Sequence, residues 1–123
     1  MLVRESISFQ RNRDPKQALG VGVRVLIEEW LEEMSVTNYV INDDLTIDVN
    51  GEVYLDNKDL ITFPEYIKFR NVSGYFYCDY NQLTSLEGCP STVGGSFLCG
   101  NNKKRFSEKE VRKYCKVNGN ISC

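Results

Sequence analysis

The sequence repeats one stretch, Val72-Ser-Gly-Tyr-Phe-Tyr-Cys-Asp-Tyr-Asn-Gln-Leu83, on both sides of itself. Shifted forward by 21 residues, this stretch aligns with Val93-Gly-Gly-Ser-Phe-Leu-Cys-Gly-Asn-Asn-Lys-Lys104. Shifted back by 23 residues, it aligns with Val49-Asn-Gly-Glu-Val-Tyr-Leu-Asp-Asn-Lys-Asp-Leu60. A unit this short cannot bury its own apolar face, so the repeat predicts three units stacked into a solenoid.

Apolar residues alternate over a short run within each unit, which predicts a strand whose apolar side chains all face one way. Stacking of the units then predicts two buried columns. The first column contains Val53, Phe76 and Phe97, and the second contains Leu55, Cys78 and Cys99.

An asparagine follows the strand in two of the units, at Asn81 and Asn102. Leu83 and Leu86 come next at a spacing of three, and this order is typical of a leucine-rich repeat of 20–29 residues. We expect both amides to turn inward and to hydrogen-bond backbone groups that are freed where the chain leaves the strand.

Two phrases, Leu83-Thr-Ser-Leu-Glu-Gly-Cys-Pro90 and Val93-Gly-Gly-Ser-Phe-Leu-Cys-Gly-Asn-Asn102, resemble small leucine-rich-repeat-like proteins of tailed phages. The similarity covers residues 38–123, including a lead-in at 41–51 and a closing helix at 106–115. The opening at 5–15 also resembles a phrase that begins many small phage proteins. The family implies an interaction module and brings no general activity.

Two helices are predicted at the ends of the stack. Residues 21–34 show amphipathic spacing, and Ser107 with Glu110 forms an S-x-x-E capping box before a short apolar face. The predicted fold class is an α/β repeat, a short leucine-rich-repeat-like solenoid with a small parallel sheet capped by a helix at each end. Its parts are an N-terminal arm (1–19), an N-terminal capping helix (20–37), the repeat units (38–105) and a C-terminal cap (106–123).

The composition argues against most catalytic chemistry. The chain has five cysteines and no histidine, which excludes Ser-His-Asp and Cys-His nucleophiles and mixed Cys/His zinc sites. No C-x-x-C pair occurs either. We therefore expect no enzyme activity, no cofactor and no metal.

The cysteines also bear on the compartment. No apolar run is long enough for a membrane span or a signal peptide, so we expect the host cytosol, where thiols stay reduced. Cys78 and Cys99 are then expected to pack as buried free thiols. A Cys115–Cys123 disulfide is geometrically possible but is not expected in a reducing compartment.

The outward strand positions supply the candidate binding face. Alternation aligns Tyr54, Tyr77 and Leu98 across neighbouring strands, with Tyr75 and Tyr80 beside them. Tyrosine contributes contact area at low entropy together with a polar tip, which favours a protein interface, homodimerisation included. The alternatives are aromatic packing that only stiffens the sheet, or cover by the N-terminal segment.

Charged residues give two weaker candidates. Three acidic residues lie on the same side of the sheet as the tyrosines: Glu52, Asp56 and Asp79. They could bind a cation or act as acid and base, but we favour the interpretation that they form a solvated acidic rim. A basic patch near the C-terminus comprises Lys103, Lys104, Arg105, Lys109, Arg112 and Lys113. A solvated cap is the usual role of such a run, and the acidic pI of about 5.2 argues against nucleic acid as the main partner.

The sequence therefore favours a non-enzymatic protein-binding module, a phage-encoded accessory protein that binds a host or phage protein through its sheet face. The alternative is a virion-associated or packaged protein that residues 1–19 anchor.

Overall fold

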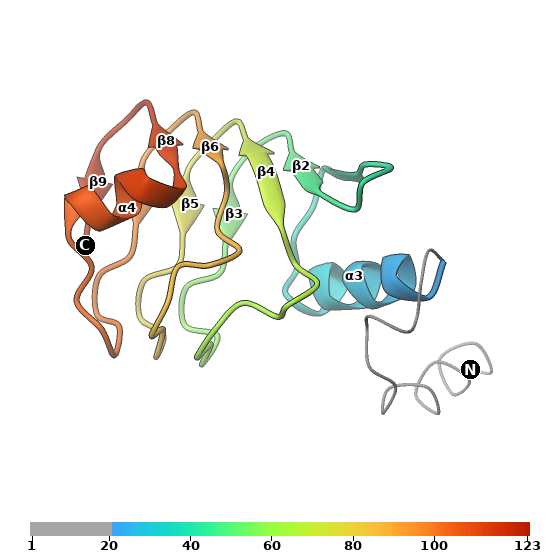
Figure 1. The fold of residues 1–123 in the computed structure, drawn as a ribbon, viewed down its shortest axis with the longest axis horizontal. Helices are drawn as coiled ribbons and strands as arrows, with labels where there is room; N and C mark the ends of the chain where they lie inside the picture. Colours follow the sequence, from blue (N-terminus) through green and yellow to red (C-terminus); the bar gives the residue numbers. More distant parts are fainter. Residues whose placement is uncertain (1–20) are drawn as a thin grey trace.

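Each repeat unit folds into one coil that contributes a strand to each of two sheets (Figure 1). The computed structural model describes residues 21–123 and has a β-solenoid-like fold with parallel sheets and two helices in that range. Neither helix has the length and apolarity needed to span a bilayer. The arm predicted for residues 1–19 lies outside the described residues.

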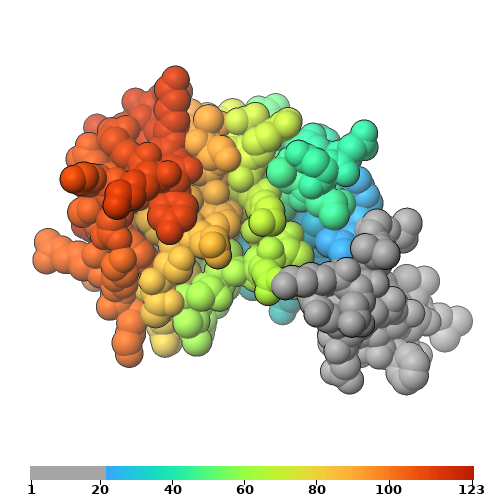
Figure 2. All heavy atoms as spheres, viewed as in Figure 1, coloured from blue at the N-terminus to red at the C-terminus, as the bar shows by residue number. Residues whose placement is uncertain are grey.

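The first sheet has the strand order β1-β2-β4-β6-β8, and all its pairs are parallel except the antiparallel pair β1–β2. Its strands are β1 Tyr39–Ile41, β2 Ile47–Val49, β4 Phe69–Val72, β6 Thr92–Val93 and β8 Lys116–Val117. The second sheet is wholly parallel. Its strands, in order, are β3 Val53–Tyr54, β5 Phe76–Tyr77, β7 Phe97–Leu98 and β9 Ile121–Ser122. In Figure 2 the sequence colours form successive bands along the long axis, one coil after another.

The strand register matches the alignment of the repeats. In the second sheet Val53 pairs with Phe76 and Phe76 with Phe97, and all three side chains are buried. Leu55, Cys78 and Cys99 are buried in the same way. Both predicted columns are therefore confirmed.

A fourth coil extends the three predicted units. Residues 116–123, which the sequence assigned to the C-terminal cap, form strands β8 and β9. Val117 continues the register of Val93, and Ile121 continues that of Phe97. Each coil also has two strands rather than one, so the structure differs from the single small sheet that was expected.

Helix α3, Val21–Glu33, covers the core at the N-terminal end of the stack (Figure 1). Ile27, Trp30 and Leu31 are buried, and the Trp30 ring meets the edge of Phe69 at 6.4 Å between centroids. The Arg24 guanidinium donates to the backbone carbonyls of Ile41 and Asn42, both at 3.2 Å, which ties the helix to the first hairpin.

Helix α4, Glu108–Tyr114, belongs to the last coil and packs near β9. Ser107 accepts a hydrogen bond from the Glu110 backbone N–H, and the Glu110 carboxylate accepts one from the Ser107 backbone N–H. The predicted capping box is thus confirmed, and it satisfies two donors that a helix start leaves unpaired.

Asn81 holds two consecutive coils together from inside. Its Oδ1 accepts hydrogen bonds from the backbone N–H groups of Lys58 (2.9 Å) and Leu60 (3.1 Å). Its Nδ2 donates to the carbonyls of Leu55 (2.8 Å) and Cys78 (3.1 Å). The amide therefore pairs buried backbone groups on both coils, as the sequence predicted.

Asn102 repeats the arrangement one coil further on. Its Oδ1 accepts from the Leu83 backbone N–H at 3.0 Å, and its Nδ2 donates to the carbonyls of Cys78 (3.1 Å) and Cys99 (2.9 Å). These two residues form a polar ladder through the interior.

We predict that Asn81→Ala lowers the free energy of unfolding by about 3 kcal/mol, because several buried backbone groups lose their partners together. Urea denaturation measures the loss. The matched control is Gln82→Ala at an exposed neighbouring position, expected to stay within about 0.5 kcal/mol of the parent. An equal, small effect of both substitutions would contradict the role of the ladder.

Candidate functional site

The outward side of the second sheet carries the predicted row of aromatic residues. Tyr54 pairs in register with Tyr77, and Tyr77 pairs with Leu98. The Tyr54 and Tyr77 rings stack at 5.0 Å with an interplanar angle of 12°, and Tyr75 stacks on Tyr77 at 5.9 Å and 27°. We call the surface made by Tyr54, Tyr75, Tyr77, Tyr80 and Leu98 the tyrosine face.

Stacking does not remove this surface from solvent. Tyr54 is 58% exposed, Tyr80 55% and Tyr75 43%, whereas Tyr77 and Leu98 are half-buried. Part of the aromatic surface thus stiffens the sheet, and a large part is available for contact. The structure brings together three of the predicted tyrosines in one stack, and within residues 21–123 no aromatic ring stacks on Tyr80.

Two glycines, Gly74 before β5 and Gly95 before β7, leave room for side chains near this surface. A side chain at Gly95 would collide with the Tyr75 ring, and one at Gly74 would collide with the Glu52 carboxylate. Each glycine therefore makes room for a side chain of the preceding coil. The glycine that recurs at Gly51, Gly74 and Gly95 in the aligned stretches is the signal in the sequence that points to these contacts.

Tyr80 has an unusual backbone conformation. Its φ is 55°, in the left-handed region that disfavours bulky side chains. The matching positions of the neighbouring coils are Asn57 and Asn101, both with φ of 54°, and asparagine tolerates this region. An exposed tyrosine thus stands where the repeat elsewhere uses asparagine.

Three carboxylates border the tyrosine face. Burial of the Asp79 carboxyl, reinforced by repulsion from Asp56, raises its pKa, and Asp79 Oδ1 is buried without a hydrogen-bond partner. The pKa of Tyr77 is raised, first by burial and then by the neighbouring rings and the carboxylates of Glu52 and Asp56. Across residues 21–123, no group of three or more Cys, Asp or Glu side chains is arranged to hold a metal ion.

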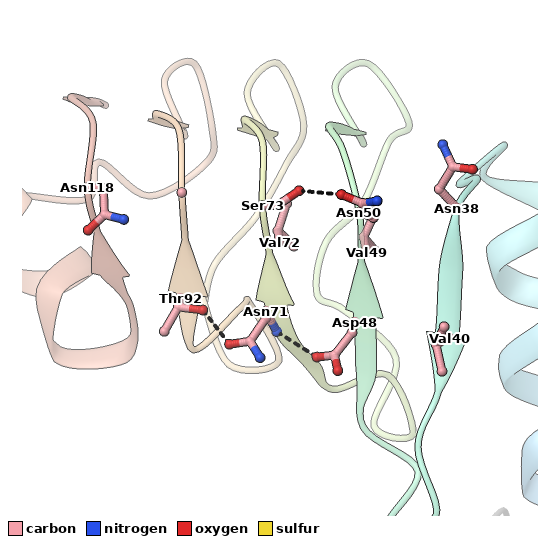
Figure 3. A pocket seen from close by; sticks show the side chains of 11 residues that line it. Asn38, Val40, Asp48, Val49, Asn50, Asn71, Val72, Ser73, Thr92 and Asn118 are labelled. Carbon is pink, nitrogen blue, oxygen red and sulfur yellow. Dashed lines mark hydrogen bonds between the residues drawn. The ribbon is translucent and has the colours of Figure 1, made fainter.

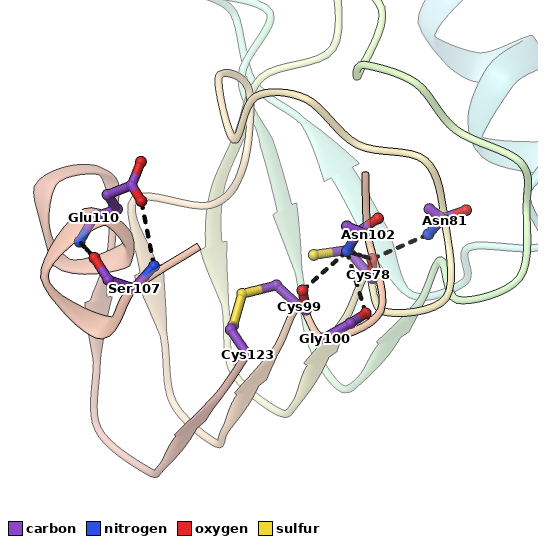
Figure 4. Close-up of a disulfide and its surroundings, with 8 residues drawn as sticks. All are labelled: Cys78, Asn81, Cys99, Gly100, Asn102, Ser107, Glu110 and Cys123. Atoms are coloured by element: carbon purple, nitrogen blue, oxygen red, sulfur yellow. Dashed lines mark hydrogen bonds between the residues drawn. A yellow bond between two sulfur atoms is a disulfide. The ribbon is translucent and has the colours of Figure 1, made fainter. Parts of the chain in front are cut away.

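The cysteine pairing differs from the sequence expectation. Cys99 forms a disulfide with Cys123, with 4.5 Å between the Cα atoms (Figure 4). Cys99 is buried as predicted, yet it is not a free thiol, and the Cys115–Cys123 bridge left open above does not form. The partners face each other because Cys123 occupies in the fourth coil the place that Cys99 occupies in the third.

The remaining thiols are poorly suited to chemistry. Cys78, Cys89 and Cys115 are free and buried. Burial raises the pKa of Cys89 to about 12 and that of Cys115 to about 11, and it raises the pKa of Cys78 as well. A thiol held protonated at neutral pH is a weak nucleophile.

The basic patch is partly neutralised. Lys104 pairs with Glu110, and Arg112 pairs with Glu108 at 3.3 Å. The exposed side chains of Lys103, Arg105, Lys109 and Lys113 complete the predicted set. Two of the six cations thus serve local structure around α4.

A shallow groove of about 360 Å³ crosses the first sheet (Figure 3). Its polar side chains largely satisfy one another: Thr92 donates to Asn71, Asp48 accepts from the Asn71 backbone N–H at 3.1 Å, and Ser73 donates to Asn50 at 3.2 Å. This pattern is a hydrogen-bonded ladder across β2, β4 and β6, and it ties neighbouring coils of the first sheet together.

Comparisons with protein-family models, with curated proteins and with solved structures return no match for this chain.

We predict that Cys123→Ser lowers the free energy of unfolding by about 3 kcal/mol, because the bridge closes a long loop of the unfolded chain. Thermal unfolding with and without reductant measures this. Reductant should lower the melting temperature of the parent to that of the variant and should not change the variant. A parent insensitive to reductant would contradict the prediction.

We predict that Asp79→Asn raises the free energy of unfolding at pH 7, because burial of the ionised carboxyl disfavours the folded state. The raised pKa means that the folded state disfavours the ionised carboxyl, so stability is lost as the pH rises from the unfolded pKa through the folded one. The gain should therefore vanish below about pH 3.9, where the carboxyl is protonated in both states. Urea denaturation across this range tests it; Asp43→Asn, at an exposed position, is the control.

Proposed function

We propose that this protein is a non-enzymatic binding module that recognises another protein through the tyrosine face. The observation that carries the proposal is the stack of Tyr54, Tyr77 and Tyr75, which leaves large aromatic surfaces exposed on a parallel sheet. Exposed aromatic groups of this kind are enriched at protein interfaces.

The scaffold suits this role because the contact residues are held before a partner arrives. The Tyr54 and Tyr77 rings are fixed by stacking, and the Tyr75 ring rests over Gly95. Little side-chain freedom remains to be lost on binding, and preorganisation of this kind increases affinity.

We further propose that the coil is of leucine-rich-repeat type and that the protein is a phage-encoded accessory factor. The inward amides of Asn81 and Asn102 and the buried Leu83 and Leu86 support the repeat type. The Cys99–Cys123 disulfide favours a non-reducing setting over the cytosol expected from the sequence. A virion component would meet such a setting, but its predicted anchor, 1–19, lies outside the described residues.

We predict that Tyr54→Ala/Tyr75→Ala lowers partner capture at least about tenfold, because aromatic anchors carry much of the energy of an interface. The variant should keep the circular dichroism spectrum of the parent, since both side chains are exposed. Quantitative mass spectrometry of proteins retained from a bacterial lysate by immobilised parent and variant measures the ratio.

The matched control is Tyr114→Ala, which removes a tyrosine that is 48% exposed on α4. Its retained proteins should equal those of the parent. If the double variant and the control retain the same proteins as the parent, the tyrosine face is not the binding site.

A further inference from the structure

The charge on the tyrosine face has one sign. Outward positions on and beside β3 and β5 carry Glu52, Asp56 and Asp79, and no outward position on and beside β3, β5 and β7 carries a lysine or arginine. None of these carboxylates takes part in the ion pairs found within residues 21–123. Within the described part of the chain, the face therefore presents negative charge without ion-pair partners beside exposed aromatic rings.

The Tyr54 ring has one side free of neighbouring strands. β3 is the edge strand of its sheet, and the only strand beside it in that sheet is β5, which carries Tyr77. The side of the ring away from Tyr77 meets no further strand, and the residue is 58% exposed. The face of an aromatic ring attracts cations, and the carboxylates of Glu52 and Asp56, which flank the same strand, strengthen that attraction.

Tyr80 points to the same kind of contact. A tyrosine at a φ of 55° is less stable than the asparagine that both neighbouring coils use at this place. Its side chain is 55% exposed and stacks on no other ring of the described residues, so burial does not offset the conformational cost. Strained residues that the fold does not need are concentrated at binding sites.

We infer that the tyrosine face binds a cationic, arginine-containing peptide segment of its partner, with guanidinium groups stacked on Tyr54 and Tyr80 and paired with Glu52 and Asp56. This inference rests on the proposed function and specifies the chemistry of the partner. Arginine fits better than lysine because its planar group both stacks on a ring and forms two parallel hydrogen bonds with a carboxylate.

A second copy of the chain is a poorer occupant for this surface. Two tyrosine faces brought together would oppose the same uncompensated carboxylates, and like charges across an interface are unfavourable. Charge complementarity therefore selects a basic partner.

Fluorescence anisotropy with labelled oligoarginine, oligolysine and oligoglutamate peptides tests the inference. The full chain should bind oligoarginine more tightly than oligolysine and should not bind oligoglutamate, and added salt should weaken binding. Glu52→Gln/Asp56→Asn should lower the affinity for oligoarginine about tenfold or more.

The matched control is Glu28→Gln/Glu32→Gln, which removes the same charge from exposed positions of α3. It should leave the affinity within about twofold of the parent, because these carboxylates lie on α3 and are not part of the tyrosine face. Equal losses in the two double variants would mean that only net charge is sensed, and this would overturn the inference.

Tyr80→Asn separates binding from folding. It should raise the melting temperature, because the left-handed conformation suits asparagine, and it should weaken oligoarginine binding about threefold or more. An unchanged affinity would overturn the assignment of Tyr80. A concentration-dependent dimer in sedimentation that Tyr54→Ala abolishes would instead place a second copy on the face and overturn the cationic partner.

These outcomes are distinct from those of the capture experiment. Loss of partner capture in the tyrosine variant, together with no binding of oligoarginine, would overturn the cationic partner and leave the binding module standing. Capture that persists in the tyrosine variant would overturn the proposed function itself.

Discussion

Stacking in register is the constraint on which the rest of this structure depends. In a parallel solenoid, each residue lies one strand spacing from its equivalents in the coils before and after it, so a column accepts only side chains that fit one another. The column Val53, Phe76, Phe97 and Ile121 meets this requirement with apolar groups alone. Asn81 and Asn102 meet it with amides, which pair backbone groups that a turn would otherwise leave unsatisfied inside the core.

The same constraint creates the tyrosine face. Once Val53 and Phe76 are fixed inside, the next residues, Tyr54 and Tyr77, must lie side by side outside. The geometry that buries the core therefore also builds an ordered aromatic surface without any long-range loop. The surface includes features unfavourable to stability, namely the unpartnered Asp79 oxygen and the left-handed Tyr80, both on or next to this face.

The sequence predicted what depends on repetition and missed what interrupts it. The two columns, the inward asparagines and the tyrosine row follow from the repeat, whereas the capping box follows from a local S-x-x-E motif. Each has the predicted geometry. The first-sheet strands β2, β4 and β6 end at Val49, Val72 and Val93, the first residues of the aligned stretches. The other residues of each strand therefore lie outside the repeat from which strands were predicted. The fourth unit lies at a shift of 24 residues, where Val117 and Ile121 match Val93 and Phe97. It was missed because the helix signal at 106–115 placed the residues that follow it in a cap. The disulfide was missed for the same reason, since only an alignment of the fourth unit places Cys123 on Cys99.

The ends of the stack show why a short solenoid needs more than repetition. An internal coil is covered on both sides, whereas a terminal coil exposes one apolar side and one row of backbone groups. At the N-terminal end, Trp30 of α3 packs on Phe69, and Arg24 pairs carbonyls of the first hairpin. At the C-terminal end, Arg112 of α4 donates to the Val117 carbonyl at 3.5 Å, and the Cys99–Cys123 bond joins the last two strands of the second sheet. This covalent link holds the fourth coil to the third. The cysteine column thus changes its role along the stack, from apolar packing at Cys78 to a covalent bond between the third and fourth coils.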